Sequence, residues 1–456
     1  MDRLSGKRVT VIGLARQGVA LARFLAGVGA LVTVTDMKPA EALADAVAQL
    51  AGLPIRYALG GHPPEVLEGC ELLCLSGGVS PDIPIVQEAR RRGIPLSNDA
   101  LLTLERCPAA IIGITGSSGK TTTTTLVGEM LKAAGYRTWV GGNIGLPLID
   151  RLGGVRRGDL VVMELSSFQT ELFDRSPHIA AILNITPNHL DRHPSMEAYT
   201  AAKANILRFQ RPGDVAVLGY DNPATRQLLT AGTAATALAF SITTEVAAGA
   251  FLRGETLMLR LQGREEVICR RDEVRLRGMH NVQNLLAAAC LAGAAGAPLA
   301  AIARVARTFS GVEHRLEFVR TRRGARWYND SIATTPERVV AALESFTEPI
   351  VLLAGGRDKH LPWDRFAQVV RERVRCLILF GEAAGLIHQA MMEQDAKEGP
   401  EILRCGTLEE AVQAAAHVAQ VGDVVLLSPG GTSFDAFRDF AERGERFKML
   451  ARSLSE

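Results

Sequence analysis

The sequence has little net charge, few cysteines and no long apolar run, and each shortage excludes a class of protein. Its formal net charge is only +2 over 456 residues, which gives no support for a large nucleic-acid-binding surface. The seven cysteines are scattered, odd in number and without a CxxC pair, which favours reduced thiols over a disulfide framework. No apolar run approaches the length of a membrane span, and the first residues lack the apolar segment of a signal peptide. We therefore expect a soluble, cytoplasmic protein that binds neither nucleic acid nor membranes.

What the sequence does contain is a series of short, β-branched apolar runs, each followed by glycine and a helix-like pattern. At about 100–200 residues per domain, the length predicts two to four domains. The apolar runs fall into three blocks, at 8–13, 30–36 and 71–78, at 109–116, 159–167 and 179–186, and at 349–356, 376–381 and 423–431. Alternating strands and helices favour a parallel sheet in every block.

Two further segments refine this α/β prediction. Residues 249–263 resemble a hairpin, which predicts a small antiparallel addition to the central block, and residues 280–296 predict a helix rich in small residues. We therefore expect three domains: a Rossmann-like domain at 1–98, a central domain of the P-loop ATPase type at 99–311, and a Rossmann-like domain at 312–456.

The stretch "GITGSSGKTTTTTL" at 113–126 predicts a phosphate-binding loop. The usual pattern has glycine where Ile114 stands, but a strand, a small-residue turn and a helix follow one another as a phosphate site needs. Lys120 can then meet phosphate oxygens, and the Thr121 hydroxyl can ligate Mg²⁺. Glu164 ends an apolar strand, where a carboxylate Mg²⁺ ligand would lie beside such a loop. The alternative is a glycine-rich turn with a surface lysine.

Residues 9–36 nearly fit a dinucleotide-binding pattern. Gly13 and Gly18 occupy two of the three glycine positions, but Ala15 occupies the one at which pyrophosphate approaches closely, which argues against a nicotinamide cofactor. Two interpretations stay open: a nucleotide diphosphate held differently, with Asp36 accepting hydrogen bonds from hydroxyl groups, or a turn kept only for packing.

Residues 184–207 contain spacings that could suggest zinc, through His189, Asp191 and His193, but no cysteine or second ligand pair supports a tetrahedral site. Lys203 lies on a helix pattern, and the residues alone favour a solvated surface lysine. In the third block, polar loops at 311–317, 328–336, 355–360 and 427–440 cluster beside strand ends, as expected of a domain that carries an acidic substrate.

Together these segments resemble the Mur ligase family. The resemblance is carried by "GITGSSGKTTT", "VMELSSFQ", "NITPNHLDRH", "GGNIG", "EHRLE", "NDSIAT" and "LSP…SFD", which cover all three blocks in order. "MELSSFQ" and the Rossmann-like N-terminus resemble the D-glutamate-adding branch, and the shortened phosphate loop is the family's normal form. The resemblance implies an ATP-dependent ligase of peptidoglycan biosynthesis, which joins D-glutamate to UDP-N-acetylmuramoyl-L-alanine through an acyl phosphate. It also implies ATP, a pair of Mg²⁺ ions, two small-molecule substrates and a monomer.

The resemblance further assigns roles to residues. The catalytic residues would be Lys120, His189, Lys203 and Arg315. The metal ligands would be Thr121, Glu164, His189 and Lys203, the last of them carbamylated. ATP would be bound by Gly116, Ser117, Ser118, Gly119, Lys120, Thr121, Thr122, Asn281, Asn284, Arg315, Asp330 and Thr334. The UDP-substrate would contact Asp36, Lys38, Ser76, Asn143 and His189. D-glutamate would contact Thr334, Lys359, Ser433, Phe434 and Phe440.

Several positions depart from the family's pattern: Gly77 replaces proline, Ser118 asparagine, Asn188 an acidic residue, Ile332 lysine and His360 glycine. These changes bear on fine specificity, including the preference for D- over L-glutamate. Three alternatives remain: a Mur-type ligase for another amino acid, a nicotinamide-dependent oxidoreductase using residues 9–36, and a non-catalytic nucleotide sensor.

Overall fold

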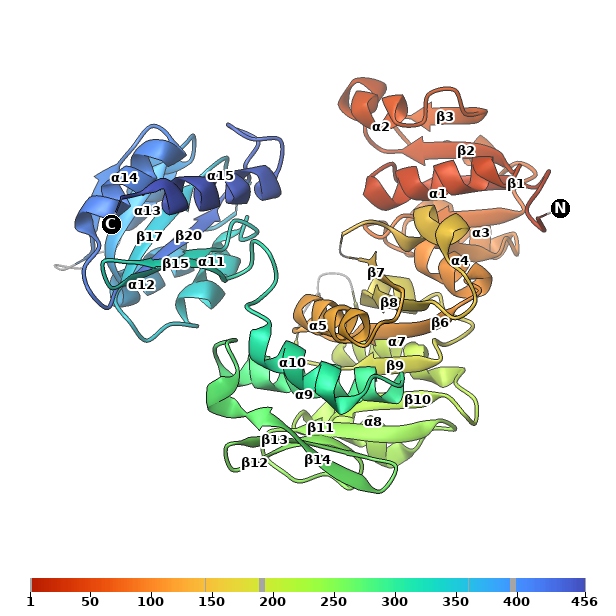
Figure 1. The fold of residues 1–456 in the computed structure, drawn as a ribbon. Coiled ribbons are helices and arrows are strands. Elements are labelled where there is room, and N and C mark those ends of the chain that lie inside the picture. The colour runs from red at the N-terminus through yellow and green to blue at the C-terminus, as the bar shows by residue number, and fades with distance from the viewer. Residues whose placement is uncertain (1, 144, 188–192, 360, 394–398, 456) are drawn as a thin grey trace. The chain divides into compact units, whose positions relative to one another are not determined.

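The computed structural model describes residues 2–143, 145–187, 193–359, 361–393 and 399–455, and these contain three β-sheets (Figure 1). The chain divides into two compact units, one of residues 1–275 with 279–309 and one of residues 276–278 with 310–456. The first unit contains two of the sheets and the second contains the third. The predicted three-part α/β fold is thus confirmed, whereas the boundaries 1–98, 99–311 and 312–456 stay predictions.

The first sheet is parallel, with the strand order β3-β2-β1-β4-β5. Its central strands are buried on both faces, as expected of a sheet covered by helices. The strands are β1 (Arg8–Ile12), β2 (Leu31–Asp36), β3 (Ile55–Leu59), β4 (Leu72–Leu75) and β5 (Leu96–Asn98). The helices are α1 (Arg16–Gly27), η1 (Ala40–Leu43), α2 (Ala44–Ala48), η2 (Pro64–Leu67) and α3 (Pro84–Arg91).

The central sheet has nine strands in the order β14-β13-β12-β11-β10-β9-β6-β8-β7. The strands are β6 (Ala110–Thr115), β7 (Thr138–Gly142), β8 (Leu160–Glu164), β9 (Ile179–Ile182), β10 (Val215–Gly219), β11 (Thr236–Ser241), β12 (Gly249–Arg253), β13 (Thr256–Leu261) and β14 (Arg264–Arg270). Neighbouring strands from β7 to β12 pair in parallel, and β12–β13 and β13–β14 are antiparallel. The predicted hairpin at 249–263 is therefore confirmed.

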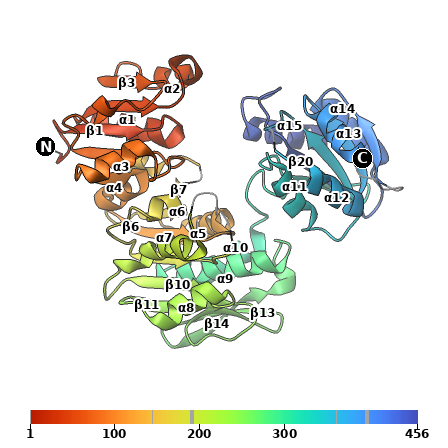
Figure 2. The ribbon, with the colours of Figure 1, turned by 180° about the vertical axis from the view of Figure 1, so that it is seen from behind.

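Helices cover both faces of the central sheet. One face carries α5 (Lys120–Ala133), α9 (Met279–Ala294) and α10 (Leu299–Thr308), and α9 packs on α5 (Figure 1). The view from behind shows α7 (Met196–Arg208) and α8 (Pro223–Ala231) on the other face (Figure 2). The remaining helices of this unit are α4 (Asp99–Arg106), η3 (Leu148–Gly154), α6 (Ser167–Thr170) and η4 (Arg271–Glu273).

The sheet of the second unit has the order β15-β16-β20-β17-β18-β19. Its strands are β15 (Glu317–Arg322), β16 (Ala325–Asn329), β17 (Ile350–Gly355), β18 (Val374–Phe380), β19 (Glu401–Arg404) and β20 (Val424–Gly430). Its helices are α11 (Pro336–Leu343), α12 (Asp364–Arg373), α13 (Ala384–Met392), α14 (Leu408–Val418) and α15 (Phe440–Ser453).

The three strands predicted in this unit pair in parallel, as expected, and an edge strand that was not predicted adds one antiparallel pair. Strand β15 pairs with β16 in antiparallel register, because Arg323 and Gly324 form a tight turn with positive φ angles of 45° and 76°, which brings the chain straight back. Along β17 successive side chains enter opposite cores, Leu352 with α11 and α12 and Leu353 with α14 and α15, so both faces of this sheet are buried.

Among the described residues, no helix is both long enough and apolar enough to span a bilayer.

Candidate active site

The turn between β6 and α5 has the form of a phosphate-binding loop. Ile114 lies within β6, as predicted, and Gly116–Gly119 form the turn before the helix begins at Lys120. The Lys120 ammonium folds back over the turn and donates to the carbonyl oxygens of Gly116 at 2.9 Å and Ser117 at 3.3 Å. The ammonium group and the N-terminus of a 14-residue helix therefore lie at the same turn, which creates a positive potential suited to phosphate.

The third residue of the turn, Ser118, is held by Asn184, which follows β9. The Ser118 N–H donates to Asn184 Oδ1 at 2.9 Å, and Asn184 Nδ2 donates back to the Ser118 carbonyl at 3.3 Å. Ser117 Oγ donates to the Thr186 carbonyl at 3.0 Å and lies 3.1 Å from the Tyr199 hydroxyl. The turn is thus fixed from the carboxyl end of the neighbouring strand.

Glu164, the last residue of β8, lies against the first turn of α5. Its carboxylate accepts hydrogen bonds from Thr121 Oγ1 at 2.9 Å and from Asn143 Nδ2 at 3.0 Å, and the residue is only 2% exposed. A buried carboxylate beside a hydroxyl offers the oxygen ligands that Mg²⁺ prefers. The predicted UDP-substrate residue Asn143 is therefore placed at Glu164. Its backbone N–H also donates to the backbone carbonyl oxygen of Glu164 at 2.9 Å.

Lys203 is not the solvated surface lysine that the residues alone favoured. It is 1% exposed, and its Nζ donates to the Gly116 carbonyl at 3.0 Å and packs 4.6 Å from the ring centre of Tyr199. Burial lowers the pKa of Lys203 to about 7, and the charge of Lys120 acts in the same direction. The correction has a simple cause: α7 covers the central sheet, and its buried side includes this lysine together with Tyr199 and Ile206.

His189 and the neighbouring Asn188 and Asp191 lie outside the described residues. His193 is buried, with Nε2 3.0 Å from Ser167 Oγ and its ring stacked on Phe168 at 5.4 Å between centroids. His193 therefore contributes to packing and hydrogen bonding beside α6.

Two asparagines of α9 approach the phosphate loop from the other side of α5. Asn284 donates to Asn281 Oδ1 at 3.1 Å, and Thr123 Oγ1 lies 3.5 Å from Asn284 Oδ1. A Cβ atom at Gly119 would lie 2.2 Å from Asn284 Oδ1, and Gly119 has a φ of 80°. Only glycine fits this point of the turn without displacing Asn284. The structure thus places Asn284 at the loop and Asn281 beside Asn284, and their binding of ATP stays a prediction.

The predicted UDP-substrate residues of the first sheet lie at the carboxyl ends of its strands. Asp36 lines a cavity of ≈ 260 Å³ together with Gly13 and His62, and its carboxylate accepts from the backbone N–H groups of Leu14 at 2.7 Å and Lys38 at 2.9 Å. The Lys38 side chain is exposed. Ser76, by contrast, is buried beside a second and much smaller cavity of ≈ 10 Å³.

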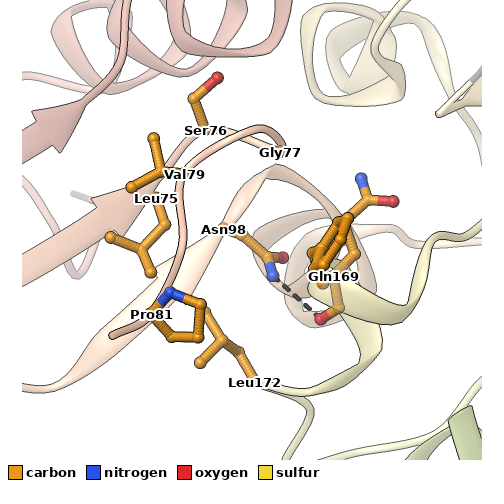
Figure 3. Close-up of a pocket in the computed structure, with 9 residues that line it drawn as sticks. Leu75, Ser76, Gly77, Val79, Pro81, Asn98, Gln169 and Leu172 are labelled. Carbon is orange, nitrogen blue, oxygen red and sulfur yellow. Dashed lines mark hydrogen bonds between the residues drawn. The ribbon is translucent and has the colours of Figure 1, made fainter. Parts of the chain in front are cut away.

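This small cavity marks the junction between the first and central sheets (Figure 3). Asn98 Nδ2 donates to the Gln169 carbonyl at 3.0 Å, and Gln169 Nε2 donates to the Asp99 carboxylate at 3.1 Å. Burial raises the pKa of Asp99 to about 6, although the hydrogen bond from Gln169 opposes the shift. The motif "MELSSFQ" therefore has two structural tasks: Glu164 faces the phosphate loop, and Gln169 joins the two parts of the first unit.

The second unit places Arg315 and Asp330 close to each other. Arg315 is exposed. The backbone N–H of the next residue, Leu316, donates to Asp330 Oδ1 at 3.2 Å. Ser428 Oγ donates to Asp330 Oδ2 at 2.8 Å. Burial raises the pKa of Asp330 to about 7 despite that hydrogen bond and the nearby charge of Arg315.

The predicted D-glutamate residues belong to the same unit. Lys359 Nζ donates to Thr334 Oγ1 at 3.2 Å, which brings two of them together. Ser433 is buried, whereas Phe434 is 61% exposed. Phe440 begins α15, and its ring meets His314 edge-on at 6.0 Å. His360 lies outside the described residues. The carbonyl oxygen of Ile332 accepts a hydrogen bond from the Arg338 guanidinium at 3.1 Å.

A cluster of Glu313, His314 and Glu445 in this unit has the composition of a metal site, with its ligand atoms within 4.8 Å of one another. Lys448 already supplies positive charge there, since its ammonium donates to Glu313 at 2.8 Å and Glu317 at 3.1 Å and lies 2.7 Å from Glu445. We therefore interpret this cluster as an ion-pair network.

Sequence reasoning missed several residues that shape these sites. They are Asn184 at the phosphate loop, Tyr199 beside Lys203, Gln169 with Asp99 at the junction, and His62 in the larger cavity. Gln169 was inside a recognised motif, and Asn184 and Tyr199 lay in a segment already singled out. His62, in "GGHP", follows an edge strand that was not predicted, so no signal pointed to it.

Comparison with protein-family models assigns all three parts of the chain. Residues 7–98 match the Mur ligase MurD-like N-terminal domain, residues 114–292 the Mur ligase middle domain, and residues 314–431 the Mur ligase glutamate ligase domain.

Curated proteins resemble the chain over nearly its full length. A UDP-N-acetylmuramoylalanine--D-glutamate ligase of Symbiobacterium thermophilum is 45% identical, covering 98% of each chain. A protein of the same name from Acetivibrio thermocellus is 41% identical and covers 99% of this chain and 97% of its own. Among solved structures, UDP-N-acetylmuramate-alanine ligase MurC from Thermotoga maritima aligns with a TM-score of 0.57 and 20% identity over 98% of this chain and 99% of its own. That distant likeness bears on the fold alone.

Proposed function

The chain belongs to the Mur ligase family, and we propose that it joins D-glutamate to UDP-N-acetylmuramoyl-L-alanine at the expense of ATP, in peptidoglycan biosynthesis. The curated relatives that carry this activity in their names match the chain from end to end at 37–45% identity. The observation within the structure that best supports this reaction is the phosphate loop, where the Lys120 ammonium contacts the turn and Thr121 contacts Glu164.

The chemistry explains why such a loop is needed. A free carboxylate is a poor acyl donor at neutral pH, so an oxygen of the L-alanine carboxylate first attacks the γ-phosphorus of ATP, and ADP leaves. The amine of D-glutamate then attacks the carbonyl carbon of the acyl phosphate, the C–O bond to phosphate breaks, and the nitrogen loses a proton. Negative charge collects around the transferred phosphoryl group, where fixed positive groups lower the barrier most.

Lys120 supplies one of these positive groups. Its ammonium already lies over the turn, so it needs little rearrangement to meet β- and γ-phosphate oxygens, and the backbone of Gly116–Gly119 with Thr121 and Thr122 would hold the phosphates. Asn281 and Asn284, fixed against the same loop, would bind the remaining part of ATP. In the second unit Arg315, Asp330 and Thr334 are the proposed ATP residues.

The residues at Glu164 fit a divalent cation. The Thr121 hydroxyl and the Glu164 carboxylate lie 2.9 Å apart, and both are hard oxygen ligands. With His189 and Lys203 they are the residues that we propose to hold a pair of Mg²⁺ ions. When bound, Mg²⁺ would neutralise phosphate charge during the transfer.

Lys203 can serve such a site only after modification, because an ammonium group cannot ligate a cation. A neutral lysine amine attacks CO₂, an N–C bond forms and a proton is released, which leaves a carbamate anion. Burial of Lys203 lowers its pKa to about 7, so a large fraction of the amine is neutral at physiological pH. We therefore propose that Lys203 is carbamylated.

The remaining roles are distributed over the three predicted domains. Residues 1–98 would bind the UDP-substrate through Asp36, Lys38 and Ser76, with Asn143 and His189 contributing from residues 99–311. Residues 312–456 would bind D-glutamate through Thr334, Lys359, Ser433, Phe434 and Phe440. We further propose a monomer in the cytoplasm, where both small-molecule substrates and ATP would be available.

The other functions are not favoured. A nicotinamide-dependent oxidoreductase would use the turn after β1, but the Leu14 N–H there is occupied by Asp36, and the curated relatives are ligases. A non-catalytic sensor would not need Glu164 and Thr121 in contact beside the loop.

The function is tested by phosphate release from ATP with UDP-N-acetylmuramoyl-L-alanine and a panel of amino acids. We expect release only when both the nucleotide and glutamate are present, with the D form preferred. Equal release with L-alanine or meso-diaminopimelate would contradict the proposed specificity, and release that needs no UDP-substrate would contradict the proposed reaction.

A further inference from the structure

The larger cavity of the first sheet is lined by a histidine, His62, to which no function has been assigned above. The cavity, of ≈ 260 Å³, lies at the carboxyl ends of β1 and β2, and its lining includes Asp36 and His62 together with Ile12, Met37, Val79 and Ile83. Sites that enclose a whole ligand of drug size usually measure about 300–1,000 Å³. A mostly apolar space of this smaller size suits a single flat ring with a few polar edges.

The hydrogen bonds around His62 fix which ring nitrogen carries a proton. Thr35 Oγ1 lies 2.8 Å from the Gly61 carbonyl oxygen and 3.0 Å from His62 Nδ1. A carbonyl oxygen only accepts, so the single hydroxyl proton of Thr35 is donated to Gly61. His62 Nδ1 must therefore be the donor to Thr35 Oγ1, and in the neutral imidazole Nε2 is an acceptor.

The surroundings keep this imidazole neutral. Burial lowers the pKa of His62 below its usual range, and the opposing charge of Asp36 does not reverse the shift. Within the part of the chain that the structure describes, no hydrogen bond to His62 Nε2 is found. One lining residue of the cavity, His62, therefore carries a neutral nitrogen acceptor, and Asp36 is a second lining residue with acceptor atoms.

We propose that His62 is a specificity-determining residue for the nucleobase, and that its Nε2 accepts a hydrogen bond from the N3–H group of uracil. This inference rests on the proposed function, which places a UDP-linked substrate on the first sheet. Uracil carries a proton on N3, whereas cytosine carries a lone pair there. The imidazole Nε2 would accept a hydrogen bond from uracil, whereas with cytosine its lone pair would face the lone pair of N3. It therefore discriminates between two bases of equal size.

The experiment compares the affinities of UDP and CDP for the full chain and two variants, measured by calorimetry at about pH 8. The side-chain oxygen of His62→Gln can replace the Nε2 acceptor, whereas His62→Asn can replace only the Nδ1 contact to Thr35. We expect the unchanged chain to prefer UDP by about tenfold, His62→Gln to keep most of that preference, and His62→Asn to bind both with nearly equal affinity. An unchanged preference in His62→Asn would overturn the proposal.

Two controls separate the possible failures. His417→Asn changes an exposed histidine on α14 and should leave the ratio unaltered. If the unchanged chain and His62→Asn instead bind 2′-deoxy-UDP with equal affinity, His62 Nε2 accepts from the ribose 2′-hydroxyl. In that case the assignment to N3–H is wrong. Loss of ATP binding would reveal a misfolded variant, in which case His62→Ala replaces it. Failure of the unchanged chain to bind either nucleotide would contradict the proposed function as well as this inference.

Discussion

Two strand–turn–helix segments of the first unit look alike in sequence and differ in what their turns do. After β1, the turn from Gly13 leads into α1, and after β6, the turn from Gly116 leads into α5. In the first, the Leu14 N–H is taken by the Asp36 carboxylate at 2.7 Å. In the second, the Lys120 ammonium donates a hydrogen bond to the Gly116 carbonyl oxygen at 2.9 Å. A negatively charged side chain therefore lies at the first turn and a positively charged side chain at the second.

The glycines of the two turns also serve different ends. A Cβ at Gly18 would lie 1.8 Å from the Gly13 carbonyl oxygen, so this glycine allows α1 to pack closely on its strand. A Cβ at Gly119 would instead meet Asn284 of α9 at 2.2 Å. A glycine pattern after a strand thus reports close packing in both cases, and only the charged residues around it indicate a phosphate site.

The largest expected effect is that of Lys120→Ala. Removing the cation from the second turn should lower kcat for phosphate release by about 10²–10³-fold, since one fixed charge at the transferred group contributes about that much. Lys132→Ala is the matched control, because Lys132 is exposed near the end of the same helix and pairs with Glu129. If Lys120→Ala and Lys132→Ala were equally active, the positive charge at the second turn would have no functional role, and the two turns would not differ in this respect.

Gly119→Ala should lower activity by about 10²-fold, because the added methyl group displaces Asn284 and shifts the turn. Gly135→Ala is the control, since Gly135 also has a positive φ, of 89°, but no atom within 4 Å of the added Cβ. It should cost about 1 kcal/mol of stability and leave steady-state activity unaltered. If both variants lose the same activity, backbone strain rather than the contact with Asn284 is responsible.

Lys203→Ala should reduce activity by about 10–100-fold if the lysine holds the metal as a carbamate. A short-chain carboxylate added to this variant should restore part of the activity, because it can replace the lost anion. Full activity without the additive would show that the buried lysine only packs against Tyr199.

Gly18→Ala should lower the stability of the fold without changing the binding of ATP. Overpacking against the Gly13 carbonyl should lower the free energy of unfolding by about 1–3 kcal/mol, with the KM for ATP unchanged in the folded fraction. Denaturant unfolding and steady-state kinetics measure the two effects. A raised KM for ATP would place the first turn in the ATP site.

The smallest effect concerns Asp99 at the junction of the two sheets. Burial raises the pKa of Asp99 in the folded state to about 6, well above the ordinary value of an aspartate carboxyl. The folded state therefore holds the proton more tightly than the unfolded state, and stability falls as pH rises between the two pKa values. Asp99→Asn removes this dependence. The stability of the variant relative to the unchanged chain should rise by about 1–2 kcal/mol between about pH 4.5 and about pH 7.5. Urea unfolding measures this difference, and a constant difference would contradict it. Asp174→Asn, at a largely exposed residue, should show no such trend.

Local patterns in the sequence predicted the segments in which neighbouring residues determine the structure. The run from Ala110 to Ala133 forms its strand, turn and helix as expected, because each part has its own signal. The edge strand β3 escaped prediction because its residues are only partly buried and show no clean alternation. Strand β15 was missed for a similar reason, since Glu317 and two arginines interrupt any apolar run along it.

Contacts between distant segments were beyond the reach of pattern alone. Alanines and polar residues alternate irregularly along α7, so nothing in its sequence marks the side that buries Lys203. The contact between Gln169 and Asp99 joins residues 70 positions apart, and the proton on His62 Nδ1 follows only from the position of Thr35. Of these residues only Lys203 received a role from the family resemblance, and the structure supplies the physical reason for its burial.

The central claim is that the phosphate held at the second turn moves onto a substrate carboxylate. It is tested most directly with UDP-N-acetylmuramoyl-L-alanine whose terminal carboxylate is labelled with oxygen-18, incubated with ATP and D-glutamate. The carboxylate oxygen that attacks the γ-phosphorus stays with phosphate when the amine displaces it. We therefore expect each released phosphate to carry one labelled oxygen, and amide formation with unlabelled phosphate would contradict the account.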